Sequence, residues 1–193
     1  MQESGQEIGQ ESGQVFADAR ALIAHMSALG VLASSEGLAM SELDHGLQSA
    51  ALVARAAPDD VELQVAALLH DLAHPWDEAG QPRHALMGAN AVRPLLGERV
   101  ARLIAGHVPA KRWLVTADPD YRATLSAASI ATLAAQGADM SAAERAWFEA
   151  LPDWQAMVML RRADDGAKVP GADVPGLDAW VDAIHQLAAR HRS

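Results

Sequence analysis

The chain has 193 residues, half of them hydrophobic, which is enough for one domain with a single sizeable core. Its formal net charge of −10 argues against nonspecific binding to nucleic acids or anionic membranes, because both depend on a basic surface. It contains no cysteine, which excludes thiolate metal sites and fits a reducing compartment.

The first 14 residues repeat the sequence Gln-Glu-Ser-Gly-Gln without apolar periodicity. We interpret residues 1–14 as a polar N-terminal extension and residues 15–193 as a single domain. No apolar run approaches the roughly 20 residues of a membrane span, and the N-terminus lacks a signal-peptide pattern. We therefore expect a cytoplasmic protein with neither a membrane nor a nucleic-acid partner, and the sequence leaves its oligomeric state open.

The rest of the chain has helical periodicity, with Ala and Leu at most apolar positions. Turns that contain glycine and proline interrupt the pattern, and no comparable strand pattern occurs. Pro109 is expected to end the helix that carries His107. The sequence predicts an all-α fold, a single helical bundle, with helices near 15–29, 43–56, 60–73, 84–95, 97–108, 118–136, 141–149, 152–163 and 176–191.

Two adjacent residues of the metal-ligand type, His70 and Asp71, end the apolar stretch that begins at Leu63. Apolar positions cover most of that helix, so both side chains should point into the protein. Burying an imidazole and a carboxylate costs roughly several kcal/mol unless each has a partner. The pair therefore requires a metal or a strong hydrogen-bond network, and we favour the metal.

Four more potential ligands lie in or beside predicted helices, namely His45, His84, His107 and Asp164. Imidazole and carboxylate ligands suit iron, manganese or zinc, and the ligand types alone do not distinguish these metals. Six ligands are more than one tetrahedral centre uses. If Asp71 bridges, two metals each receive three or four protein ligands and keep open positions for substrate and solvent.

Both lysines of the chain closely follow a candidate ligand, Lys111 after His107 and Lys168 after Asp164. An ammonium group at these places suggests capture of a phosphoryl or carboxylate group, although two lysines in an arginine-rich chain can also reflect composition alone. The arginine pair 161–162 offers a second anion contact, and one of the two can equally lie on a solvated helix end.

Five segments carry motifs typical of a known family. They are Leu43-Asp-His45-Gly-Leu-Gln-Ser-Ala, Ala66-Ala-Leu-Leu-His70-Asp71-Leu-Ala-His74, Gly106-His107-Val-Pro-Ala-Lys111-Arg-Trp-Leu-Val, Leu125-Ser-Ala-Ala-Ser129-Ile-Ala-Thr-Leu-Ala-Ala-Gln136-Gly and Arg161-Arg-Ala-Asp164-Asp-Gly-Ala-Lys168-Val-Pro-Gly. Over about residues 40–190 the chain resembles the HD-domain family, and more closely its mixed-valent di-iron oxygenases that cleave carbon–phosphorus bonds.

This resemblance implies an HD-domain helical bundle with two iron ions in the mixed-valent Fe(II)/Fe(III) state, bridged by Asp71. Asp164 is preferred to Asp165 as a ligand because of its spacing from Arg161 and Lys168. The matching motifs assign one iron to His45, His70, Asp71 and Asp164, and the other to Asp71, His84 and His107.

The resemblance also implies that a small organophosphonate is the substrate and O2 the co-substrate. A 1-hydroxyalkylphosphonate would be oxidised to phosphate and a carboxylic acid, with Fe(III) orienting the substrate and Fe(II) binding O2. Lys111 and Arg161 would neutralise the phosphonate and orient its C1–H bond. The implied substrate-binding residues are His74, Lys111, Ser129, Gln136 and Arg161, and the implied catalytic residues are Asp71, His74 and Lys111.

The loop before His45 departs from the family pattern. Relatives carry a tyrosine and a glutamate that respond to substrate, where this chain has Ser35 and Leu38. Leu38 cannot pair with an ammonium group, so an aminoalkyl substrate loses its expected partner. We therefore favour a hydroxyphosphonate whose side chain stays open, with a small compound such as hydroxymethylphosphonate to be tested beside the amino compound. Glu36 or Glu42 can replace the missing carboxylate if the loop is shifted.

Two other functions are compatible with parts of this pattern. Most HD-domain proteins resemble metal-dependent phosphohydrolases, so the main alternative is a hydrolase of nucleotides or phosphate esters. The second is a regulatory module that has lost the chemistry, against which the presence of all six ligands argues. A requirement for O2 separates the oxygenase from the hydrolase.

Overall fold

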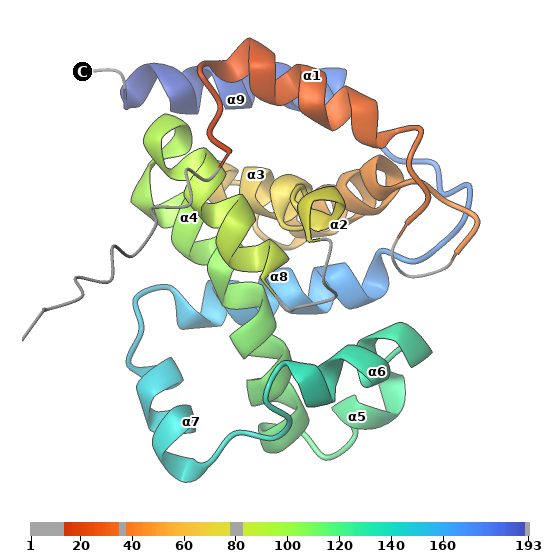
Figure 1. Ribbon diagram of the computed structural model, residues 1–193, viewed down its shortest axis with the longest axis vertical. Coiled ribbons are helices and arrows are strands. Elements are labelled where there is room, and N and C mark those ends of the chain that lie inside the picture. Colours follow the sequence, from red (N-terminus) through yellow and green to blue (C-terminus); the bar gives the residue numbers. More distant parts are fainter. Residues whose placement is uncertain (1–13, 35–37, 78–82, 192–193) are drawn as a thin grey trace, which may run out of the picture.

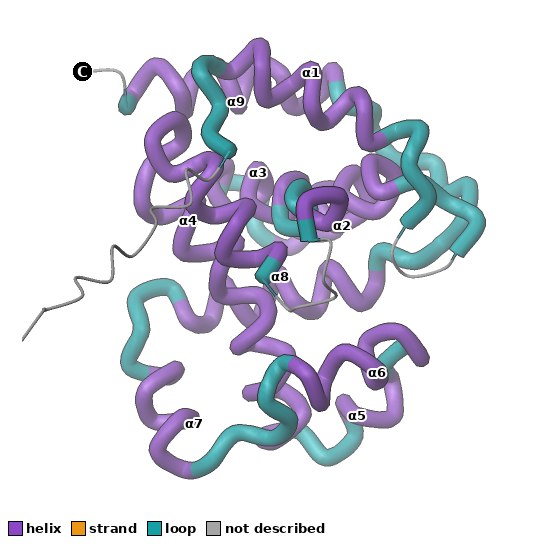
Figure 2. Tube along the Cα trace, in the orientation of Figure 1, coloured by secondary structure: helices purple, strands orange, loops and turns teal. Residues whose placement is uncertain are grey.

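The computed structural model describes residues 14–34, 38–77 and 83–191 (Figure 1). These residues form helices joined by loops (Figure 2), and the backbone bridge between Ala33 and Ser41 is isolated, so the all-α prediction is confirmed. None of the described helices combines the length and the apolar character that crossing a bilayer requires. The elements are α1 (Ala19–Leu29), α2 (Glu42–Ala56), α3 (Val61–Leu69), the 3₁₀ turn η1 (His74–Trp76), α4 (His84–Ala117), α5 (Tyr121–Thr124), α6 (Ala127–Ala135), α7 (Ala142–Glu149), α8 (Trp154–Gly166) and α9 (Asp178–Arg190).

The apolar helix α3 lies at the centre of the bundle, as its sequence predicts, and all its residues from Leu63 to Leu69 are buried. Helices α2, α4, α8 and α9 pack around it, and one continuous core runs from Phe16 to Ala188. A smaller apolar cluster lies where the C-terminal half of α4 meets α5 and α6, in the lower part of Figure 1. Because α3 is enclosed, the residues that follow its C-terminus are held inside the protein.

Side-chain caps fix the start of the helices that carry candidate ligands. The Ser41 hydroxyl accepts from the backbone N–H of Asp44 at 3.0 Å, while the Asp44 carboxylate accepts from the Ser41 N–H at 2.9 Å. This capping box satisfies two backbone donors and places His45 in the first turn of α2. Ser126 caps α6 in the same way, by accepting from the N–H of Ser129.

The predicted end of a helix at Pro109 is wrong, since α4 continues to Ala117. A proline removes one backbone hydrogen bond, and here the buried residues Ile104 and Leu114 anchor the helix on both sides of it. The predicted break before residue 97 appears as a kink within α4, where Gly97 adopts φ 87°.

Two other predicted boundaries also differ from the structure. The helix predicted over 60–73 ends at Leu69, and a turn follows that contains His70 and Asp71. The helix predicted over 118–136 is divided into α5 and α6, because Leu125 is extended and the hydroxyl of Ser126 begins a new helix.

Helices α2 and α3 approach each other closely at Gly46. A Cβ atom at this position would lie 2.5 Å from the carbonyl oxygen of Leu68, so the two backbones would have to separate. We expect Gly46→Ala to lower the free energy of unfolding by about 1–3 kcal/mol in urea titrations. The matched control is Gly88→Ala in α4, whose Cβ would lie at ordinary contact distances of 3.6–3.7 Å from neighbouring side chains and should cost less. Equal losses would contradict the explanation.

Candidate functional site

The six predicted metal ligands converge from the N-terminus of α2, the turn after α3, both halves of α4, and α8. Their side chains form two groups, and within each group the ligand atoms lie within 4.8 Å of one another. The first group is His45, His70 and Asp164, and the second is Asp71, His84 and His107. Each group has the residue types and the spacing of a three-ligand metal site.

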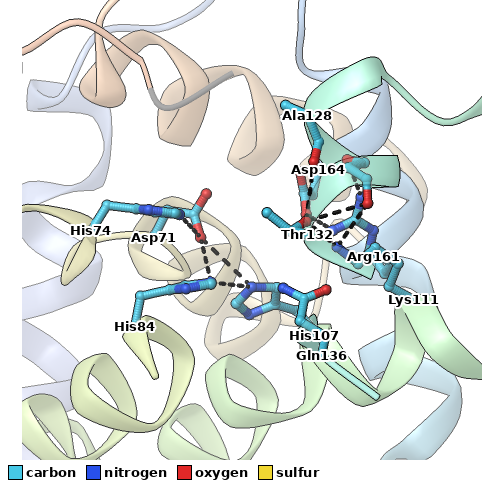
Figure 3. A pocket seen from close by; sticks show the side chains of 11 residues that line it. Asp71, His74, His84, His107, Lys111, Ala128, Thr132, Gln136, Arg161 and Asp164 are labelled. Carbon is cyan, nitrogen blue, oxygen red and sulfur yellow. Dashed lines mark hydrogen bonds and ion pairs between the residues drawn. The ribbon is translucent and has the colours of Figure 1, made fainter. Parts of the chain in front are cut away.

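Asp71 lies between the two groups and offers one oxygen to each. Its Oδ2 is 3.3 Å from Nε2 of His70 and 3.6 Å from Nε2 of His45. Its Oδ1 is 3.5 Å from Nε2 of His84 and 3.6 Å from Nε2 of His107. In Figure 3 the Asp71 carboxylate points toward these two histidines of α4. A bridging carboxylate requires this arrangement.

Three of the histidines are oriented by the main chain. Their Nδ1 atoms lie 2.7–2.8 Å from backbone carbonyl oxygens, which pair His45 with Ala167, His70 with Ala67 and His107 with Ile104. A histidine that donates through Nδ1 keeps its Nε2 lone pair for a metal. All three Nε2 atoms face the other ligands.

Several buried polar atoms of this cluster lack a hydrogen-bond partner or face another nitrogen. Nε2 of His45, Nε2 of His70 and Oδ1 of Asp71 make no hydrogen bond with the described part of the chain. Nε2 of His84 and Nε2 of His107 face each other at 3.2 Å. A metal about 2.0–2.2 Å from such nitrogens and oxygens would satisfy all of them at once. The donor set therefore fits two metal ions without sulfur ligands.

Burial and charge act in opposite directions on the pKa values of these groups. Burial is the largest single influence on the pKa of His70 and lowers it, but the charge and contact of Asp71 together with the charge of Asp164 outweigh burial and raise the pKa to about 9. The pKa of His74 is raised to about 9 for the same reasons. Burial prevails at His84, whose pKa falls to about 4. Burial also works against the ionised form of Asp71, yet His70 and His74 hold its pKa well below the usual range. The site therefore contains a buried ionised carboxylate that attracts cations.

A small cavity of about 70 Å³ opens beside the second ligand group. All five residues that were predicted to bind substrate line it, and they come from η1, α4, α6, the position just after α6, and α8. Figure 3 shows the histidines on one side of it and Lys111, Arg161 and Thr132 on the other. The lining residues are Asp71, His74, His84, His107, Lys111, Ala128, Ser129, Thr132, Gln136, Arg161 and Asp164.

The side of the cavity opposite the histidines is cationic. Lys111 is only 2% exposed, and its ammonium group lies 2.9 Å from Oγ1 of Thr132. Arg161 is 4% exposed and pairs with Asp164 at 2.7 Å. A buried ammonium and a buried guanidinium beside a small polar cavity have the chemistry that anion-binding sites use.

The other two predicted anion contacts lie outside the cavity lining. The ammonium group of Lys168 lies 3.4 Å and 3.3 Å from the hydroxyls of Ser126 and Ser129. Arg162 is exposed and pairs with Asp118 at 3.0 Å, so it is the solvated member of the arginine pair. Of the loop residues, Leu38 is half-buried, and Ser35 and Glu36 lie outside the described residues.

Sequence reasoning missed two residues behind the cavity, Tyr121 and Asp165. Asp165 follows Arg161 by four positions, a spacing at which helical side chains meet, so this pair was detectable. The contact between Tyr121 and Arg161 joins residues 40 positions apart, and the sequence carries no signal for it.

Comparison with known proteins agrees with this geometry. The family model for the HD domain matches residues 28–140. A hydroxymethylphosphonate dioxygenase of Gimesia maris is 41% identical over 73% of this chain and 74% of its own length. A [1-hydroxy-2-(trimethylamino)ethyl]phosphonate dioxygenase (glycine-betaine-forming) of Leisingera caerulea is 28% identical over 77% of this chain and 79% of its own. An uncharacterised protein of Acanthamoeba polyphaga mimivirus is 31% identical over 75% and 70%, respectively.

Proposed function

The chain belongs to the HD-domain family, and on this premise we propose that it is an O2-dependent di-iron oxygenase that cleaves the carbon–phosphorus bond of a 1-hydroxyalkylphosphonate. The observation that carries the proposal is a carboxylate, Asp71, shared by two ligand groups beside a small cationic cavity. The similarity to the proteins from Gimesia maris and Leisingera caerulea, both phosphonate dioxygenases, supports it.

The proposed cofactor is a pair of iron ions in the Fe(II)/Fe(III) state, bridged by Asp71. When bound, the pair supplies the O2 activation and the redox capacity that amino-acid side chains lack. The first ligand group and the second ligand group would each hold one ion, and the backbone carbonyls behind His45, His70 and His107 would keep the imidazoles in place. Because Asp164 belongs to α8, beyond the matched residues 28–140, we propose that the catalytic domain extends over residues 15–193.

The reaction balances without an external reductant. One O2 adds one oxygen atom to C1 and one to phosphorus as the C–P bond breaks, so hydroxymethylphosphonate would yield formate and phosphate. Lys111 and Arg161 would neutralise the phosphonate and hold C1 toward the ligand groups. His74, whose Nε2 lies 3.2 Å from Oδ1 of Asp71 and whose ring stacks on His84, would contact the substrate from the opposite side.

A compact substrate fits this site best. The cavity of about 70 Å³ accommodates a small phosphonate more readily than a nucleotide. Leu38 provides no charge for an amino group. We therefore propose hydroxymethylphosphonate as the first substrate to test. The cytoplasmic location of the protein stays a prediction.

The test is to load the protein anaerobically with Fe(II), oxidise it partially, and follow O2 uptake together with phosphate release. Hydroxymethylphosphonate and 2-amino-1-hydroxyethylphosphonate are compared as substrates. We expect one O2 consumed per phosphate released, and loss of both in His84→Ala. Metal-dependent phosphate release from nucleotides or phosphate esters without O2 uptake would overturn the oxygenase and favour the hydrolase.

A further inference from the structure

Behind the cationic side of the cavity lies a hydrogen-bonded network that the proposed function leaves unused. It joins Tyr121 at the start of α5 to Asp165 in α8 and to Lys168 just after that helix. We propose that Tyr121 and Asp165 are positioning residues that fix Arg161 and, together with Lys168, direct the hydroxyl proton of Ser129 at the substrate phosphonate. This inference rests on the proposed function and deepens it.

The guanidinium of Arg161 is held on three sides. Its Nε donates to the Tyr121 hydroxyl and to Oδ2 of Asp165, each at 3.1 Å. Its Nη2 donates to Oγ of Ser129 at 3.2 Å and also to Oδ1 of Asp165, and its Nη1 pairs with Oδ2 of Asp164 at 2.7 Å. A guanidinium has five N–H groups in one plane, so these contacts leave one hydrogen on Nη1 for a ligand. The plane in which that hydrogen lies is set by Asp165.

Tyr121 in turn fixes the carboxylate of Asp165. Its hydroxyl accepts from Nε of Arg161 and donates to Oδ2 of Asp165, so it closes a ring of three side chains. Burial, together with Asp165, raises the pKa of Tyr121, which keeps the phenol protonated as a donor. The ring of Tyr121 is only 3% exposed and packs in the apolar cluster with Leu125 and Leu133, so the hydroxyl has a fixed position.

The hydroxyl of Ser129 is constrained from two directions. Its Oγ accepts from Nη2 of Arg161 at 3.2 Å and from Nζ of Lys168 at 3.3 Å. A hydroxyl has two lone pairs and one proton, so both acceptor positions are used and the proton has to be donated elsewhere. Ser129 lines the cavity, where an oxygen of a bound phosphonate is the natural acceptor. Asp165 pairs with Arg161 and lies 3.8 Å from Nζ of Lys168, so it holds both of the cations that orient the Ser129 hydroxyl.

Positioning and simple electrostatics predict opposite effects for Asp165. Its negative charge lies beside a site that binds an anion, so removing the charge should strengthen phosphonate binding if electrostatics alone decided it. If Asp165 instead orients Arg161 and Ser129, Asp165→Asn should weaken binding although it makes the site more positive. The sign of the change therefore tests the inference.

The protein is loaded anaerobically with Fe(II), oxidised partially to the Fe(II)/Fe(III) state and titrated with hydroxymethylphosphonate by calorimetry in the absence of O2. The kcat and KM are then measured with O2. We expect Tyr121→Phe and Asp165→Asn each to raise Kd and KM about tenfold, with kcat changed less than about threefold and metal content unchanged. In an Arg161→Gln background, Asp165→Asn should cause no further loss, because its effect passes through Arg161.

The matched control is Asp118→Asn, which removes the partner of the neighbouring exposed Arg162 and should leave Kd unchanged. Tyr121→Phe keeps the packed ring, so it reports on the hydroxyl even if Asp165→Asn folds poorly. Equal or tighter binding in a folded Tyr121→Phe or Asp165→Asn protein overturns the positioning roles while the oxygenase stands. A wild-type protein that neither binds nor oxidises the phosphonate overturns the proposed function and this inference with it.

Discussion

Replacing Asp71 with alanine is expected to remove both metal ions and to lower O2-dependent phosphate release at least about 1,000-fold. The reason is geometric: Oδ2 of this carboxylate faces His45 and His70, and Oδ1 faces His84 and His107. One substitution therefore takes a ligand from each group. Metal analysis by mass spectrometry after dialysis measures the first effect, and O2 uptake measures the second.

Two comparisons make the Asp71 result specific. His84→Ala removes a ligand from the second group alone, so it should keep up to one metal per chain where Asp71→Ala keeps almost none. Asp139→Ala removes an exposed carboxylate and should keep the wild-type content. If Asp71→Ala and His84→Ala retained equal amounts of metal, Asp71 would not be the bridge.

Replacing Lys111 with methionine is expected to lower kcat/KM for hydroxymethylphosphonate about 100-fold or more while metal content stays the same. The ammonium group is almost fully buried and lies at the cavity, where it contacts Thr132 and the backbone oxygen of Ser129. Methionine keeps most of the length and packing of the side chain and removes the ammonium group, with its charge and its hydrogen bonds. A phosphonate dianion would then lose a charge-assisted hydrogen bond in a site with little water to replace it.

Steady-state kinetics and anaerobic substrate titration measure this effect, with Arg122→Gln as the control for loss of a positive charge outside the cavity. Most of the change should appear as weaker phosphonate binding. A Lys111→Met protein with normal kcat/KM, or one that has lost its metals, would show that the ammonium group does not bind the substrate.

The fold and the metal-ligand groups were largely predictable because their signals are local. The buried helix α3 follows from an unbroken run of apolar residues, and the six ligand residues stand out as imidazoles and carboxylates in or beside apolar helices. The five residues predicted to bind substrate also line one cavity, although their contacts with substrate stay a prediction.

The features that were missed depend on tertiary structure. Pro109 was expected to end a helix because local sequence ignores the packing that holds α4 together on both sides of it. The ring formed by Tyr121, Arg161 and Asp165 depends on how α5 lies against α8, and no periodicity encodes that placement. Sequence patterns predicted which residues carry the chemistry better than which residues orient them.

The main-chain anchoring of His45, His70 and His107 has a consequence for how such an enzyme can diversify. Backbone carbonyls persist whatever side chain the anchoring residue carries, so point substitutions at Ala67, Ile104 or Ala167 leave these hydrogen bonds available. Arg161, in contrast, is oriented entirely by other side chains, each of which a single substitution can remove. During evolution, the metal-binding half of the site should therefore persist while the anion-binding half changes. New substrate preferences can then arise on an inherited metal centre.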